Sequence, residues 1–531
     1  MRSGRPFPST PVAARGGCGH GRPLAAIALV ILAGCTRLGP DFESPRETWT
    51  DSWHSPSLDR LRQGQAPDVD GQWWRQFGDP VLDRLVAAAD TGNPGLRIAG
   101  LRVLEARAAL GIAESGRYPQ VQQASAGALY LDRNQSGGAR PVDSKLWQYN
   151  AGFDLAWELD FWGRFARAIE SADAAYFAAQ ANYEDALVLL RAQIADTYFT
   201  LRTAEARLAI ARDNAERQKR SYAITEQLYK SGNNDELDLQ QAKTQYLGTL
   251  SSVPQFEAQV ARTRNTLAVL LGRPPGTLPE LGPGPALIPL PDKAVLADVP
   301  TALLLRRPDV RAAEWQVAAQ SAQIGVAMAE LYPAVSLFGS IAWSGTSANG
   351  SSNSLDLLGG PSLTWNLFDH GRIEGNIRVQ DARLQQLIEL YRDQVRQAAR
   401  EADDAATGLL KALERERILR EAAGSAERSL ELANAQYREG YSDFQRVLDA
   451  QRALFVQQDS YLQTRSDAVS SLITLYKALG GGWQSHPDPL GPATRAQMRR
   501  RTDWGGLLDE PAPVASTPAA ASPAVQEKPE P

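Results

Sequence analysis

The chain has 531 residues, with 56 Lys and Arg against 61 Asp and Glu, so its formal net charge is only −5. This balance is too even to indicate nucleic-acid binding, and the length permits several domains. The chain contains two cysteines, Cys18 and Cys35.

The N-terminus has the pattern of a secretory signal. Four arginines precede residues 24–33, a run of ten apolar residues. A membrane-spanning helix needs about 20 such residues, so we predict a signal peptide at residues 1–34. No other apolar run approaches that length, and no transmembrane helix is expected.

Cys35 follows directly on this signal. The string Leu-Ala-Gly-Cys at 32–35 resembles the bacterial lipoprotein box. The resemblance implies that Cys35 becomes the mature N-terminus and carries a covalent diacylglyceryl group and an N-acyl lipid. Cys18 would leave with the signal, which excludes disulfides, a cysteine metal cluster and thiol catalysis. The alternative is an ordinary secretory signal in which Cys35 is incidental.

The rest of the sequence contains an internal repeat. Its markers are Tyr118-Pro119 and Tyr332-Pro333, 214 positions apart, and two pairs 208 apart, Gly163-Arg164 with Gly371-Arg372 and Tyr229-Lys-Ser-Gly232 with Tyr437-Arg-Glu-Gly440. A six-residue difference therefore falls between the Tyr-Pro and Gly-Arg markers. From there both copies continue for 69 residues without a gap.

The gapless stretches predict two long helices, at 164–232 and 372–440. One inserted residue would rotate the rest of a helix by about 100°, so a helix that must keep its buried face tolerates no gap. Apolar side chains of the first stretch follow a heptad seam, formed by Leu187, Leu190, Ile194, Leu201, Ala204, Leu208 and Ala211, with Thr197 at the remaining position. Each helix would be about 100 Å long; several shorter stacked helices are the alternative.

The segment between the markers alternates with period two. From 147 to 159 every odd position is apolar, and the even positions are polar or small. This pattern predicts a strand with one apolar face. Similar patterns predict strands at about 121–132, 334–344 and 355–367, joined by polar turns. Each repeat thus supplies one two-stranded hairpin, which gives four strands per chain.

These strands are candidates for crossing a bilayer, which a tilted strand does in about 9–11 residues. Aromatic residues lie near the ends of the apolar faces, where interfacial girdles occur: Trp147, Trp157, Trp343 and Trp365. A soluble sandwich strand shows the same alternation, but the lipoprotein signal favours the membrane. Four strands cannot close a barrel, and lipid does not tolerate open edges. Several chains must therefore share one cylinder, two giving eight strands and three giving twelve.

Five further strings, in order along the chain, indicate the family: 35–42, 73–80, 307–314, 448–452 and 475–483. With them, residues 35–484 resemble the outer-membrane efflux proteins, the TolC-like outer-membrane factors, and in particular the lipoprotein branch that serves RND-type (resistance-nodulation-division) pumps. The resemblance implies a mixed α/β membrane protein that is mostly helical. It would be a homotrimer whose coiled helical periplasmic barrel continues into a twelve-stranded transmembrane β-barrel in the outer membrane.

The resemblance also divides the chain. After the signal peptide at 1–34 come a lipidated N-terminal segment and equatorial region at 35–92, a first repeat at 93–299 and a second at 300–484. Part of the equatorial region is expected near 272–299. Residues 485–531 are rich in Pro and Ala, lie outside the resemblance and are predicted to form a disordered tail.

Two short strings look like helix stops. Gly232 and Gly440 can take the left-handed conformation that closes a helix, and Tyr229 and Tyr437 precede them by three residues. Residues that can cap the next helix follow: Asn233, Asn234 and Asp235 in one copy, Ser442 and Asp443 in the other. The resemblance implies that these hairpins are periplasmic tips where an adaptor protein docks; simple turns are the alternative.

Just after the second tip, Gln445, Asp449 and Arg452 match the constriction of the family. Three symmetry copies of Asp449 would form an acidic ring that favours cations, and Arg452 would tether neighbouring helices. Gln445 stands where relatives often carry an apolar residue, which argues against a hydrophobic seal. The alternative is a solvated Asp–Arg pair worth about 0.2–0.5 kcal/mol.

The sequence shows no Gly-rich phosphate loop, paired metal motif or nucleophile elbow. We therefore expect no enzyme, no metal site and no cofactor beyond the lipid. The resemblance implies a passive exit duct for drugs or other small toxic compounds, which an inner-membrane pump of RND type supplies through a periplasmic adaptor. A duct for ABC-driven type I protein secretion and a non-conducting, lipid-anchored coiled-coil scaffold are the alternatives.

Overall fold

The structure is a computed structural model of the chain. It describes residues 37–47, 55–61, 71–135, 142–276, 278–282, 288–289, 301–347, 353–485, 487–488 and 490–509. Cys35, the predicted signal peptide and most of 272–299 lie outside these residues. The chain divides into two compact units. The sheet unit contains Met1–Pro40, Ala113–Ile169 and Ala322–Gln380, and the helical unit contains Asp41–Ile112, Glu170–Ser321 and Asp381–Pro531.

The chain is mostly helical, with one sheet. Its elements are α2 (Pro56–Leu61), η2 (Trp73–Phe77), α3 (Pro80–Gly92), α4 (Pro94–Ser115), β1 (Val121–Gln135), β2 (Val142–Leu159), α5 (Arg164–Lys230), α6 (Glu236–Leu270), α7 (Thr301–Arg306), α8 (Pro308–Ala329), β3 (Ala334–Thr346), β4 (Ser354–Thr364), α9 (Arg372–Arg438), α10 (Phe444–Ala478), α11 (Gly491–Arg501) and η3 (Gly505–Leu508).

The sheet is four-stranded and antiparallel, in the order β1-β2-β3-β4. The four predicted strands are confirmed, with two differences in extent. The β1–β2 hairpin is longer than predicted, because its polar ends, Asp132 to Gln135, still pair with Val142 to Lys145. The last strand is shorter than predicted: it ends at Thr364, and the Trp365 indole instead donates a hydrogen bond to the Leu331 carbonyl, 3.0 Å away.

An aspartate caps the start of each of the two long helices, α5 and α9, whose first residues belong to the sheet unit. The Asp160 carboxylate accepts hydrogen bonds from the Phe165 and Ala166 amides at the start of α5. Asp369 accepts in the same way from Gly371 and Ile373 at the start of α9. These caps satisfy amides that the first helical turn leaves without an internal partner.

The N-terminal segment lies close against α8 in the same unit. A Cβ atom on Gly325 would lie only 2.5 Å from the Leu38 carbonyl oxygen, so no larger residue fits there. The Arg167 guanidinium donates hydrogen bonds to the carbonyls of Leu38 and Gly39, the first at 2.9 Å. Leu38 and Gly39 are thereby held against α5 and α8.

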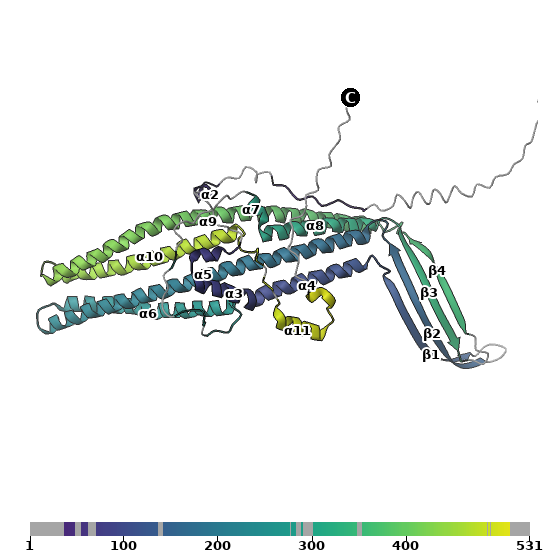
Figure 1. Cartoon of the computed structure of the whole chain (residues 1–531), viewed down its shortest axis with the longest axis horizontal. Helices are drawn as coiled ribbons and strands as arrows, with labels where there is room; N and C mark the ends of the chain where they lie inside the picture. The colour runs from purple at the N-terminus through teal and green to yellow at the C-terminus, as the bar shows by residue number, and fades with distance from the viewer. Residues whose placement is uncertain are drawn as a thin grey trace, which may run out of the picture. The chain divides into compact units, whose positions relative to one another are not determined.

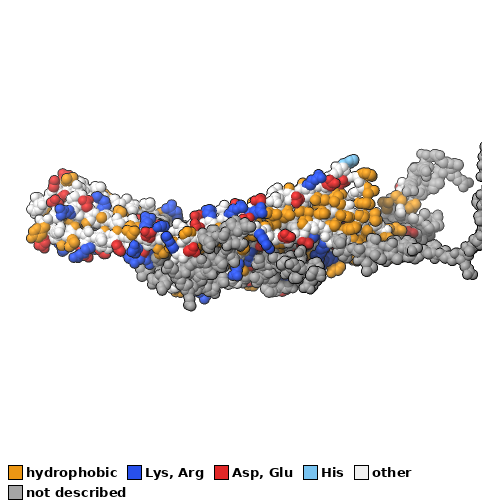
Figure 2. Space-filling model, turned by 90° about the horizontal axis from the view of Figure 1, so that it is seen from above, with side chains coloured by type: hydrophobic (Ala, Val, Ile, Leu, Met, Phe, Trp, Pro, Cys, Tyr) orange, Lys and Arg blue, Asp and Glu red, His pale blue; other side chains and the backbone are white. Residues whose placement is uncertain are grey.

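Two long helical hairpins dominate the helical unit. α5 turns into α6, and α9 turns into α10, and both turns lie at the same end of this unit (Figure 1). α5 and α9 have 67 residues each, and α6 and α10 have 35 each. The two predicted long helices are confirmed, and the alternative of several shorter stacked helices is wrong. Lys and Arg side chains are interspersed with Asp and Glu along the helices on the face shown in Figure 2.

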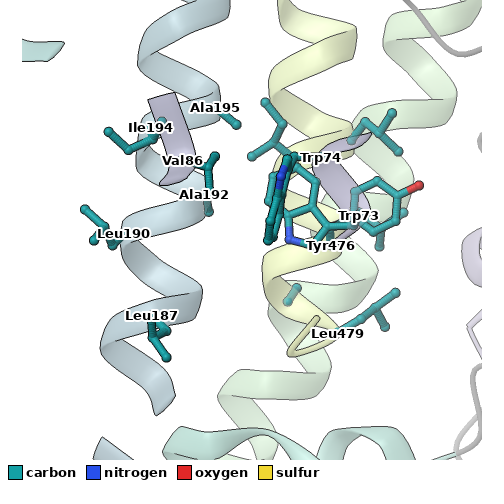
Figure 3. Packing of buried hydrophobic residues seen from close by; sticks show 14 of the residues in the cluster. Trp73, Trp74, Val86, Leu187, Leu190, Ala192, Ile194, Ala195, Tyr476 and Leu479 are labelled. Atoms are coloured by element: carbon teal, nitrogen blue, oxygen red, sulfur yellow. The ribbon is translucent and has the colours of Figure 1, made fainter. Parts of the chain in front are cut away.

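A hydrophobic core fixes α5 against α10 and the η2 turn. Six of the eight predicted seam residues are buried, and Leu208 and Thr197 are half-buried. Trp73 stacks on Tyr476 with ring centroids 5.2 Å apart, and Trp74 lies beside them (Figure 3). Fully burying a large apolar side chain stabilises the fold by about 1.5–3 kcal/mol. The aromatic residues of the string at 73–80 therefore contribute to the stability of this core.

Arg191 on α5 links three parts of this core. Its guanidinium forms a bidentate ion pair with Asp90 of α3, at 3.1 and 2.7 Å. It also donates to the carbonyls of Gly482 and Ser485, which follow α10. The Trp74 ring lies 5.1 Å from the guanidinium carbon. Arg191 therefore satisfies buried acceptors on segments that are far apart in sequence.

The prediction of a disordered tail at 485–531 is wrong for its first part. α11 is an 11-residue helix, and η3 follows it. Leu490, Met498 and Leu508 are buried and pack against Leu101 and Leu104 of α4. This packing stabilises a helix that composition alone does not indicate. Residues 510–531 lie outside the described residues.

Candidate channel gate and docking tips

Both tip turns close with the same backbone motif. Gly232 has φ +76° and Gly440 has φ +78°. At the first tip the Asn233 amide donates to the Leu228 carbonyl and the Gly232 amide to Tyr229, at 2.8 and 2.9 Å. Tyr441 and Gly440 make the equivalent bonds to Gln436 and Tyr437, at 2.9 and 3.1 Å. These pairs define a Schellman motif, which requires a residue that accepts positive φ.

The capping prediction is only partly right. Asp235 and Asp443 occupy the N-cap positions of α6 and α10, but neither side chain accepts a hydrogen bond from its helix. Instead, Tyr437 packs on Phe444 with ring centroids 5.2 Å apart. Burial, with the nearby charge of Asp238, raises the pKa of Tyr437 above its usual value. Tyr229 is exposed at the other tip.

The three predicted gate residues lie together on one exposed face of α10. The Gln445 amide donates to Asp449 Oδ1 at 3.2 Å, and Arg452 Nη1 lies 3.3 Å from the same oxygen. All three side chains are exposed. Within one chain this cluster is a solvated row of one anion, one cation and one amide.

A groove between α6 and α10 runs beside this row. It has a volume of about 520 Å³. Its lining is mostly polar and comes from α6 (Gln240, Gln241, Thr244, Gln245, Gly248, Thr249) and α10 (Gln445, Leu448, Arg452). Sequence reasoning missed the α6 side. The repeat itself carried the signal, because Gln241 and Thr244 stand 208 positions before Asp449 and Arg452.

The sheet exposes one strongly apolar face. Phe153, Ile341, Leu357 and Leu363 are all exposed on it, and an apolar patch of this kind marks a contact with lipid or protein. Trp147 and Trp157 of β2 are ten residues apart, about 34 Å along a strand. Tilted by about 40°, that span matches the apolar band of about 25 Å of outer-membrane strands. Trp343 lies on β3, whereas Trp365 lies just beyond β4.

Two searches of the described residues are negative. No group of three or more His, Cys, Asp or Glu there is arranged to hold a metal ion. No helix there is long and apolar enough to cross a membrane.

The chain combines a four-stranded sheet that has one exposed apolar face with two hairpins of 67- and 35-residue helices, and these are the parts of an outer-membrane channel subunit. The chain belongs to the outer membrane efflux protein family, whose model matches residues 85–273 and 299–481.

Similar proteins agree with this assignment. The probable outer membrane lipoprotein SilC of Salmonella typhimurium is 30% identical over 473 residues, which cover 87% of this chain and 98% of SilC. The cation efflux system protein CusC of Escherichia coli O6:H1 is 29% identical over 467 residues, covering 86% and 97%. The solved structure of the outer-membrane channel OprN is 34% identical, has a TM-score of 0.73 and covers 85% of this chain and 99% of that one.

Proposed function

We propose that three copies of this chain form the outer-membrane duct of a tripartite efflux pump. The observation that carries the proposal is the sheet: four strands with one apolar face and two open edges cannot be stable in lipid alone. Three copies supply twelve strands for one closed barrel. The α5–α6 and α9–α10 hairpins continue it as a helical tube in the periplasm.

The duct is passive: its residues hold the partner proteins in position and control the opening of the path. The tips at Tyr229–Gly232 and Tyr437–Gly440 are firm turns that project from the hairpins and present the surface on which a periplasmic adaptor docks. The inner-membrane pump, of RND type, supplies the energy. The chain itself contributes a path and a constriction.

Asp449 and Arg452 form that constriction. In one chain they are exposed and 3.3 Å apart, and around a three-fold axis they become alternating rings of charge. Carboxylate rings favour cations, and each Arg452 can donate to the Asp449 of a neighbouring copy. The first repeat offers the Gln241 amide and the Thr244 hydroxyl at the equivalent positions, so charged and uncharged polar side chains alternate around the ring.

Cys35 supplies the membrane anchor. It carries diacylglyceryl and N-acyl lipid, three positions before Leu38, whose carbonyl accepts a hydrogen bond from Arg167. SilC, named as a probable lipoprotein, supports this reading. The lipid therefore enters the outer membrane beside the barrel.

The proposed cargo is drugs or other small toxic compounds. A second cargo class, metal cations, is favoured by the acidic Asp449 position and by the name of CusC. A gene deletion in the native host separates the two. Loss of the duct should sensitise cells to the drugs or to the metal ions, and the intact gene should restore resistance. Unchanged sensitivity to both classes, in a host without another duct, would refute the efflux role.

A further inference from the structure

A small cavity lies in the helical unit and shares no lining residue with the groove beside the gate. It has a volume of about 220 Å³ and is lined by α5, α8, α9 and α10, together with Arg307 and Gly480 next to helix ends. Pockets for drug-sized ligands measure about 300–1,000 Å³. A molecule that fits here must be smaller than a typical drug, which argues against the proposed drug cargo as its occupant.

Charged side chains line this cavity, and some of them satisfy one another. Arg307 forms a bidentate ion pair with Asp309, at 3.0 and 2.8 Å, and donates a hydrogen bond to Glu401 at 2.9 Å. Asp185 of α5 and Lys477 of α10 also line the cavity. Within the part of the chain that the structure describes, neither the Asp185 carboxylate nor the Lys477 ammonium forms a hydrogen bond or an ion pair. The cavity therefore contains one anion and one cation that have no direct partner there.

The Asp185 carboxylate is unfavourable for the protein as it stands. A charge that is taken out of water without a hydrogen-bonded partner loses its hydration and gains nothing in return. Burial, with the charge of Asp309, raises the pKa of Asp185 to about 6, although the nearby cations Arg307 and Lys477 act against the shift. The group is thus mostly ionised at pH 7. A bound group that donates charged hydrogen bonds to this carboxylate would compensate the burial.

A second cavity adjoins the first, between α9 and α10. It has a volume of about 480 Å³, and Glu401 and Lys477 line both cavities. Its charged lining contains more carboxylates than cations: Glu401, Asp404, Asp467, Arg400 and Lys477. Arg400 pairs with Asp404 at 3.1 Å, whereas no described cation pairs with Asp467. A ligand that extends from the first cavity into the second therefore meets a second carboxylate that lacks a cationic partner.

We propose that the two cavities bind a free amino acid that has a basic side chain, such as lysine. The α-ammonium group of the ligand donates hydrogen bonds to Asp185, its carboxylate accepts from Lys477, and its side-chain cation lies near Asp467. The two unpartnered groups of the first cavity have opposite charges, which favours a zwitterion over a simple cation or anion. The site lies within one chain and does not depend on the number of copies in the channel.

The ligand would connect the two helical hairpins. Asp185 belongs to the α5–α6 hairpin, and Lys477 belongs to the α9–α10 hairpin. These groups come together only in the folded helical unit, so the ligand binds the folded chain and not the unfolded one. A ligand of this kind stabilises the fold in proportion to the logarithm of its concentration once that exceeds its Kd. The amino acid would therefore act as a small-molecule stabiliser of the packing between the hairpins.

Calorimetric titration of the purified full-length protein in detergent tests the ligand class with three related molecules. Lysine carries all three charged groups, norleucine lacks the side-chain ammonium, and 1,5-diaminopentane lacks the carboxylate. Lysine should bind, and each of the other two should bind about tenfold more weakly or worse, because each loses one charge-assisted contact. Asp467→Asn should reduce the preference for lysine over norleucine and leave the affinity for norleucine unchanged.

Variants of the first cavity test the location. Asp185→Asn and Lys477→Met each remove one proposed contact, and Asp213→Asn, at an exposed position of α5, is the matched control. Asp185→Asn removes an unpartnered buried charge, so it should fold at least as well as the natural chain. Lysine should raise the urea midpoint of the natural chain and of Asp213→Asn, but not that of Asp185→Asn or Lys477→Met.

Three results would overturn the proposal. No binding of lysine to the natural chain would show that the cavities hold no amino acid. Equal affinities for lysine and 1,5-diaminopentane would show a site for cations and exclude the zwitterion. Unchanged lysine binding by Asp185→Asn would place the ligand elsewhere. None of these results bears on the channel, which conductance measurements test separately.

Discussion

The ion pair of Arg191 with Asp90 allows a sharp test of the core. Arg191 is only 2% exposed and Asp90 is 13% exposed. Arg191→Met removes the cation but leaves the carboxylate and the carbonyls of Gly482 and Ser485 buried. Removing one partner of a buried pair costs about 3–5 kcal/mol. Arg191→Lys keeps the charge without the bidentate geometry, and we expect a loss of about 1.5–3 kcal/mol.

A matched control lies on the same helix. Arg217 pairs with Asp213 at 2.8 Å, but its side chain is 53% exposed, so Arg217→Met should change stability by at most about 0.5 kcal/mol. Urea unfolding of the detergent-extracted protein, followed by tryptophan fluorescence, compares the variants. The double variant Asp90→Asn with Arg191→Met should lose less than Arg191→Met alone, because no buried charge remains. Equal midpoints for Arg191→Met and Arg217→Met would refute the reasoning.

Four further predictions concern other parts of the chain. Burial, with the charge of Asp309, raises the pKa of Asp185 to about 6, so the folded state holds this proton more tightly than the unfolded chain and stability falls as the pH rises through about 4 to 6. Asp185→Asn should therefore stabilise the protein by up to about 3 kcal/mol at pH 7.5 but not at pH 4. Urea midpoints measured at both pH values check this, and equal effects at the two would contradict it. Asp449→Ala should make reconstituted channels leakier and less cation-selective, and conductance equal to that of the exposed control Asp213→Ala would contradict the gate. Gly232→Trp or Gly440→Trp should abolish adaptor binding in a pull-down and, with it, drug resistance; binding by an abundant variant would refute docking at that tip. A chain that ends at Ser485 lacks α11 and exposes Leu101 and Leu104, so it should unfold at a lower urea concentration than the full chain. Equal unfolding midpoints for the two chains would show that α11 adds no stability.

Periodic features were predictable from the sequence. The gapless 69-residue stretches and the seam that includes Leu187 and Ile194 predicted both long helices, with bounds that agree with the structure to within two residues at each end. The alternation from 147 to 159 gave the strand, since one face of the sheet is apolar. In the fourth predicted strand, at 355–367, the alternation continues through Trp365. The strand nevertheless ends at Thr364, and the Trp365 indole donates a hydrogen bond to the Leu331 carbonyl, outside the ladder.

Features that depend on distant contacts were not predictable. Arg191 carries no local signal, because Asp90 and Gly482 are 101 and 291 positions away. α11 lies in a Pro- and Ala-rich segment, and its stability comes from Met498 packing against α4. At the tips the sequence identifies the glycines, whose positive φ is a local requirement, but it does not show that Asp235 leaves its helix uncapped.

The α6 side of the gate groove illustrates the same limit. The repeat aligns Gln241 with Asp449, but nothing in the sequence shows that α6 packs beside α10, which is what brings Gln241 and Gln245 to the groove next to Gln445. The gate residues themselves were found by resemblance, and the structure adds that they lie on one exposed face.

The central claim is that copies of this chain enclose one water-filled path through the outer membrane. Single-channel recording of the purified, full-length protein in planar lipid bilayers tests it most directly. We expect discrete, cation-favouring conductance steps from heat-labile trimers and none from the heat-dissociated chains. Trimers that insert into the bilayer and pass no ions would contradict it.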